Sequence, residues 1–164
     1  MALAKIIPAT FLLRLIALGA TISATVVMVT SHDATTVLNL KFVAKYTNSP
    51  TFKYFALTNA IASGYGLTTI FLPFKTSLWR LVLVLDVVIL CLLDSSMSAA
   101  LAIGYVGKKG NVQAGWLPIC GQVPKFCDHA NGALICGFLA TIVYFLIVLY
   151  SLHNAVNLLT VGKA

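Results

Sequence analysis

Three charged side chains lie inside long apolar runs, and they are the residues best placed to carry chemistry: Arg14, Asp86 and Asp94. A charge in hydrocarbon costs about 3 kcal/mol or more, so each of them needs a partner. Arg14 lies about eight residues into the first run and Asp86 about six residues into the third, which places both roughly 9–12 Å below one membrane surface. We therefore predict a bidentate ion pair that leaves the membrane interior neutral and fixes the register of the helices.

Asp94 follows Asp86 by eight residues, about 12 Å deeper and about 80° further round a helix. No second arginine lies within an apolar run to pair with it. Its carboxyl group is interpreted as a neutral acid bonded to Ser95, Ser98 or a threonine hydroxyl, as a group in a wet cavity, or as a proton or cation site. We expect the hydrogen-bonded acid, because a single carboxylate is weak support for transport.

Cys120 and Cys127 lie in the segment ICGQVPKFC and could form a disulfide, half of a metal site, or two free thiols. A zinc site needs further ligands, and His129 is one candidate. A disulfide is favoured, which places this loop outside the cytosol. Cys91 and Cys136 lie inside apolar runs and are expected to be small packing residues.

The sequence contains no motif of a known catalytic site: HExxH, GxSxG and the phosphate-binding loop are all missing. The three histidines are scattered along the chain. We therefore expect a protein that is not an enzyme and has no cofactor or metal. A membrane enzyme that uses Cys120, Cys127 and His129 remains as a hypothesis, and it predicts bound metal.

Composition defines the class of protein. The chain has 164 residues, of which 60% are hydrophobic and 9% are charged, whereas soluble domains average about 25% charged residues. This is the composition of an integral membrane protein. The net charge of +7 comes from scattered lysines and arginines, which suit anionic lipid headgroups and do not form the dense patch that nucleic acid requires.

Four apolar runs have the roughly 20 residues that a membrane-spanning helix needs. They cover residues 6–29, 52–72, 81–104 and 132–152. None shows the period-two alternation of a barrel strand. We predict one all-α domain over residues 1–164, a four-transmembrane-helix bundle with outer loops 30–51 and 105–131. The short link 73–80 makes the second and third spans antiparallel neighbours.

Small residues recur at a spacing of four in each run, a pattern that lets helix backbones approach closely in lipid. They are Gly19 and Ser23; Ala56, Ala60 and Gly64; Ser96, Ala100 and Gly104; and Gly132, Cys136 and Ala140. We expect these stripes to hold the bundle together. The alternative is that one of them is an oligomer interface.

The orientation in the membrane is not settled by charge. With the disulfide loop outside, the outer loops carry six lysines, and the inner side carries four basic residues beyond Arg14. The positive-inside rule by itself predicts the opposite orientation. We give the cysteines more weight.

The sequence resembles the CASP-like proteins of plants, relatives of the Casparian strip membrane domain proteins and, more distantly, of the MARVEL four-span proteins. The resemblance covers nearly the whole chain. It rests on these segments: LLRLIALGATISA (12–24), Tyr46, PTFKYF (50–55), GY (64–65), LPF (72–74), RLVLVLDVV (80–88), SSMSAALA (95–102) and GWLPICGQVPKFC (115–127).

The resemblance implies a MARVEL-like bundle in the plasma membrane, with cytosolic termini, that forms homo-oligomers and hetero-oligomers with related proteins. It places Arg14 and Asp86 on the family's intramembrane pair, and Cys120 and Cys127 on its outer cysteines. The first outer loop lacks the acidic and aromatic signature of the true Casparian strip proteins. The resemblance therefore carries no endodermal barrier role over to this chain.

Two further functions are set against each other. The leading hypothesis is a non-enzymatic scaffold that self-associates, organises a membrane domain and recruits cell-wall-modifying partners. The alternative is a small channel, transporter or accessory subunit in which Asp94 lines a polar path.

Overall fold

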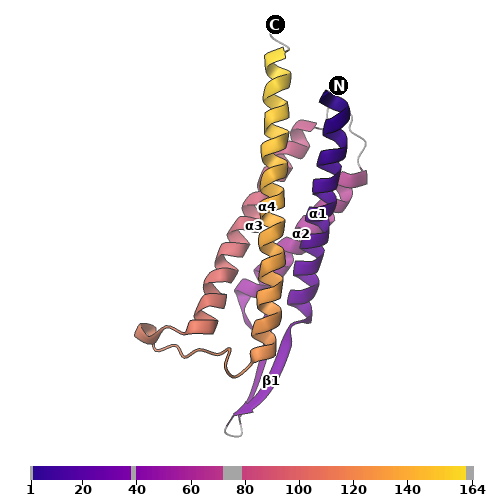
Figure 1. Ribbon diagram of the computed structural model, residues 1–164. Coiled ribbons are helices and arrows are strands. Elements are labelled where there is room, and N and C mark those ends of the chain that lie inside the picture. Colours follow the sequence, from indigo (N-terminus) through magenta and orange to yellow (C-terminus); the bar gives the residue numbers. More distant parts are fainter. Residues whose placement is uncertain (1, 38–39, 72–78, 162–164) are drawn as a thin grey trace.

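The computed structural model describes residues 2–37, 40–71 and 79–161. Four helices form an elongated bundle (Figure 1). They are α1 (Ala2–Thr30), α2 (Pro50–Phe71), α3 (Trp79–Lys109) and α4 (Pro124–Val161). The start of α1 and the end of α4 lie at the same end of the bundle, opposite a small β-hairpin (Figure 1). The predicted all-α membrane fold is confirmed.

Three helices are long and apolar enough to span a membrane, over Thr10–Thr30, Trp79–Lys109 and Pro124–Asn157. The 22 residues of α2 reach about 33 Å, enough to cross the same layer. Its sequence is less apolar because it turns Thr58, Asn59 and other polar side chains into the bundle.

The four helices form a square arrangement around the hydrophobic core. α1 and α3 each pack against α2 and α4, so α1 and α3 occupy one diagonal of the bundle and α2 and α4 the other (Figure 1). The predicted contact between the second and third spans is present. Most of the short link expected at residues 73–80 lies outside the described residues.

The second outer loop is shorter than the predicted range 105–131, because α3 continues to Lys109 and α4 already begins at Pro124. Proline suits the first turn of a helix, where its missing N–H is not needed. Gly110, the first residue after α3, has φ +71°, and a Cβ there would lie 2.7 Å from the Trp116 carbonyl oxygen. Glycine is the residue that fits this position.

The first outer loop, predicted over residues 30–51 without any strand, contains a hairpin. Strands β1 (His32–Val37) and β2 (Leu40–Lys45) pair antiparallel, with His32 opposite Lys45. Threonine and valine in β1 favour the extended backbone. α2 then begins at Pro50, two residues before the predicted start of the second span at residue 52.

The ends of the outer helices also differ from the predicted spans. α1 begins at Ala2 and α4 continues to Val161, nine residues beyond the predicted limit at 152. Polar residues end an apolar run, but they do not end a helix. The apolar pattern therefore predicted the membrane-embedded part of each helix and missed its extensions.

Candidate functional site

A buried ion pair joins α1 to α3 across the centre of the bundle. Nη2 of Arg14 lies 2.7 Å from Oδ2 of Asp86, and Nη1 lies 3.2 Å from Oδ1. The side chains are 5% and 0% exposed. The contact is the bidentate geometry that counting residues from the membrane surface predicts, and it neutralises both charges inside the hydrocarbon layer.

Two hydroxyl groups of α2 complete this site. Tyr65 donates a hydrogen bond of 2.7 Å to Oδ1 of Asp86, and Arg14 donates one of 3.1 Å to the Thr69 hydroxyl. Tyr65 and Thr69 are one helical turn apart, so they share a face of α2. We define Arg14, Tyr65, Thr69 and Asp86 as the polar cluster, which binds three helices together.

Neither hydroxyl is among the site residues predicted from the sequence. A tyrosine and a threonine four residues apart within a span, at the depth of Arg14, is the signal that could have revealed them.

The fourth helix is tied in by a separate hydrogen bond. The buried Tyr144 hydroxyl of α4 donates to the carbonyl oxygen of Ala62 in α2 at 3.0 Å. A Cβ on Gly66 would lie only 3.3 Å from that hydroxyl oxygen. The missing side chain at Gly66 therefore gives Tyr144 the room to reach α2.

Asp94 takes no part in the polar cluster. Its side chain is exposed on the outer surface of α3, and within the described ranges it has no hydrogen-bond or ion-pair partner. This differs from the expected internal hydrogen bond. The physical reason is the helical rotation: Asp86 faces the bundle axis, and eight residues later the side chain has turned away from it.

The four small-residue stripes divide between the inside and the outside of the bundle. Ser96, Ala100, Ala140 and Ala56 are buried, while Gly104, Gly132 and Cys136 are half-buried. Gly19, Ser23, Ala60 and Gly64 are exposed on α1 and α2. A Cβ on Gly19 or Gly64 would meet nothing within 4 Å. These two positions contribute no packing inside the bundle.

At the hairpin end, Cys120 and Cys127 form a disulfide with their Cα atoms 5.6 Å apart, as predicted. The sulfur atoms are bound to each other, and Nδ1 of His129 lies 2.8 Å from the Lys125 carbonyl oxygen. Among the residues with described positions, no group of three or more His, Cys, Asp or Glu side chains comes together. The metal-enzyme hypothesis therefore gains no support from this loop.

A cavity of about 340 Å³ lies beside the disulfide, between the end of α3 and the start of α4. Phe52, Leu134 and other apolar side chains make most of its wall, and Lys108 and Asp128 add one charge of each sign. This combination suits an amphipathic molecule such as a membrane lipid.

These features together define an integral membrane bundle of four helices with an internal Arg–Asp pair. The chain belongs to the Casparian strip membrane protein domain family, whose model matches residues 4–143. It is 62% identical to CASP-like protein 1C1 of Vitis vinifera over 148 residues, which cover 90% of this chain and 93% of that protein.

Two further relatives give the same result. The chain is 60% identical to CASP-like protein 1C2 of Populus trichocarpa over 141 residues, covering 86% of each chain. It is 54% identical to CASP-like protein 1C1 of Arabidopsis thaliana over 145 residues, covering 88% of each. The resemblance to CASP-like proteins is thereby confirmed. No solved structure matches the chain.

Proposed function

We propose that this protein is a non-enzymatic scaffold of the plasma membrane that associates with itself and with related family members to organise a lateral membrane domain. The observation that carries the proposal is the outward position of Gly19, Ser23, Ala60 and Gly64. Lipid gives helices no hydrophobic reason to associate, so close approach of backbones is a main source of affinity. Small residues on the lipid-facing surface provide that approach.

The polar cluster supports this function indirectly. It holds three helices with buried, mutually neutralised charges, and breaking such a pair costs about 3–5 kcal/mol. A bundle held in this way keeps its outer faces in a fixed arrangement. Fixed faces are what a repeating assembly requires.

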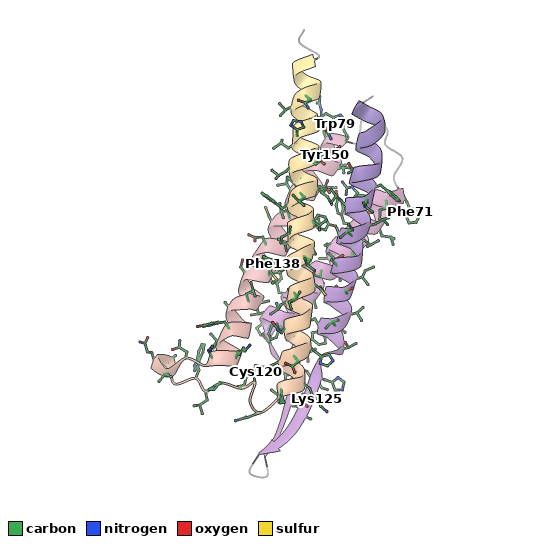
Figure 2. The ribbon with its side chains drawn as sticks, in the orientation of Figure 1. Phe71, Trp79, Cys120, Lys125, Phe138 and Tyr150 are labelled. Atoms are coloured by element: carbon green, nitrogen blue, oxygen red, sulfur yellow. A yellow bond between two sulfur atoms is a disulfide. The ribbon has the colours of Figure 1, made fainter. Side chains whose placement is uncertain are left out.

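The proposed orientation has the disulfide outside the cell and both termini in the cytosol. Disulfides persist in oxidising compartments. Cys120 and Lys125 lie near the hairpin end of the molecule, while Trp79 and Tyr150 lie toward the end with the termini (Figure 2). Tryptophan and tyrosine are the residues enriched at membrane surfaces.

We assign the recruitment of cell-wall-modifying partners to the loop between α3 and α4. It exposes large apolar side chains at the outer end: Val112 is 94% exposed, Leu117 80% and Trp116 58%. Tryptophan is a typical anchor of protein interfaces, and neighbouring exposed apolar side chains are typical of interaction surfaces. The adjacent cavity is the place we propose for a membrane lipid.

The test measures self-association and mobility of the whole chain. Gly19→Leu and Gly64→Leu fill open space and improve helix propensity, so we expect a stable bundle with weaker association. Energy transfer between labelled copies in liposomes should fall, and photobleaching recovery of a tagged copy in the plasma membrane should become faster. Leu67→Ile, on the same outer surface, is the matched control.

A native chain that stays monomeric in liposomes and recovers fast and uniformly in the cell would contradict the scaffold. The channel or transporter alternative would then lead. At present it lacks a specific observation in its favour, because Asp94 lies on the outer surface of α3 and lines no path inside the bundle.

A further inference from the structure

We propose that the outer face of α3 around Asp94 is the contact surface for a second copy of this chain, with the Asp94 carboxyl group hydrogen-bonded across the interface. The inference rests on the proposed self-association and assigns a site to it. We define the α3 face by its exposed small and polar residues: Cys91, Asp94, Ser95, Ser98 and Ala102.

Asp94 lies deep in the membrane. α3 runs from Trp79 to Lys109, so Asp94 is its middle residue, about 22 Å from each end. The hydrocarbon layer is about 30 Å thick. With Trp79 and Lys109 anchored at the two membrane surfaces, Asp94 lies close to the midplane, where alkyl chains surround any side chain that points outward.

The Asp94 carboxyl group also lacks a bonding partner within the described residues. Over the ranges that the structure describes, the Asp94 carboxyl group has no hydrogen-bond or ion-pair partner. Lipid chains cannot supply one, and an acid at the centre of a membrane helix is among the most costly residues to place there. Arg14 lies about 12 Å nearer to the membrane surface than Asp94, and it already binds Asp86 inside the bundle. The partner must therefore come from another molecule that reaches the same depth.

Several residues near Asp94 on α3 have short side chains. Cys91 and Ser98 lie three and four residues from it, so they cover the same side of α3, whereas Ser95, one residue away, lies about 100° further round at the border with α2. Their side chains are short, which permits close approach of a second helix. The two serine hydroxyls donate and accept hydrogen bonds. The Ser95 hydroxyl is 3.4 Å from that of Tyr54 in α2, at the edge of this face.

A second copy fits this face because the face complements itself. In a two-fold dimer with its axis along the bundle, every residue keeps the depth of its counterpart, and residues near the axis lie beside their own counterparts. Asp94 then lies beside the Asp94 carboxyl and the Ser95 and Ser98 hydroxyls of the other copy. Each copy supplies what the other lacks, so the contact forms twice.

The native cysteines test this geometry directly. Within the described residues the free thiols are Cys91, which is exposed on the α3 face, and Cys136, which is half-buried on α4. The full chain in phosphatidylcholine liposomes is treated with copper(II)–phenanthroline, an apolar oxidant that enters the bilayer and joins two adjacent thiols as a disulfide, and dimers are separated under non-reducing conditions. Cys136→Ser should still give a covalent dimer, and Cys91→Ser should lose it.

Variants of Asp94 provide the energetic readout. Asp94→Leu removes two symmetric hydrogen bonds of about 0.6 kcal/mol each in a membrane, so the dissociation constant should rise about eightfold. Asp94→Asn keeps a hydrogen-bonding side chain and should retain most of the association. Thr141→Val on α4, which removes a hydroxyl that bonds its own helix and lies on neither the α3 face nor the outer surface of Gly19 and Gly64, is the control and should leave the dissociation constant unchanged.

The outcomes separate the two proposals. Association without a Cys91 cross-link, and with the affinity of Asp94→Leu unchanged, would overturn the α3 interface and leave the scaffold with its other faces, or Asp94 with a different protein. A chain that does not associate at all would overturn both. If Asp94→Leu fails to fold, the cross-link on the otherwise native chain decides the question.

Discussion

The hydroxyl of Tyr144 in α4 and the carbonyl oxygen of Ala62 in α2 are 3.0 Å apart, across the diagonal that the Arg14–Asp86 pair does not use. Each diagonal of the bundle is therefore linked by a polar contact. The ion pair joins α1 to α3 and the tyrosine joins α2 to α4, so neither pair of opposite helices depends on the intervening helices alone.

Tyr144→Phe should lower the free energy of unfolding by about 1 kcal/mol, because it removes one hydrogen bond and keeps the ring that fills the core. Unfolding of the purified chain in mixed micelles with increasing SDS measures this. Tyr105→Phe is the matched control, since Tyr105 is 67% exposed and should show no effect. Equal effects of both substitutions would contradict the role of this hydrogen bond.

Substitutions of the ion pair should be strongly non-additive. Arg14→Leu or Asp86→Leu leaves one charge without its main partner, so each should cost about 3–5 kcal/mol of stability. The double variant removes both charges and should be more stable than either single variant. A double-mutant cycle by SDS unfolding measures the coupling, and additive losses would argue against the pair as the source of stability.

Gly137→Ala should destabilise the bundle by about 1–3 kcal/mol, the usual cost of overpacking a core. A Cβ at this position would lie 2.6 Å from the ring of Phe55, which is fully buried. Gly19→Ala adds the same methyl group where nothing lies within 4 Å, and it should be neutral or stabilising. The same unfolding assay compares them, and Phe55→Leu should partly rescue Gly137→Ala by removing ring atoms.

The disulfide leads to a prediction of how many cysteine thiols react before and after reduction. The denatured, unreduced chain should react with maleimide at two cysteines, Cys91 and Cys136, and at four after reduction. Mass spectrometry of protein extracted from its native membrane reads this directly. Loss of the crosslink by Cys120→Ser should cost about 2 kcal/mol of stability because the unfolded chain gains freedom. Four reactive thiols before reduction would contradict an outer location for this loop.

Much of the fold, and the ion pair at the centre of the polar cluster, could be predicted from the sequence. Helix length and apolar content predict the four helices, because the bilayer requires both. Arg14 and Asp86 are identifiable as a pair because charges within apolar runs are rare and their depths follow from counting residues.

Other features depend on how each helix is rotated and packed against its neighbours. Tyr65, Thr69 and Tyr144 have side chains common in any membrane helix, and their roles follow from the rotation of each helix about its axis. The same rotation decides that Ser96 faces the core and that Gly64 faces outward. The hairpin depends on pairing between two short strands, neither of which is distinctive in isolation.

The length of α4 has a practical consequence. Its 38 residues extend about 57 Å, nearly twice the thickness of the hydrocarbon layer. Because α4 starts close to the outer loop, much of the excess projects beyond the membrane on the side of the termini as a continuous helix. A fluorophore attached near Asn157 would therefore report the rotation of the whole bundle about the membrane normal, which makes its polarisation a direct gauge of how tightly the protein is held in an assembly.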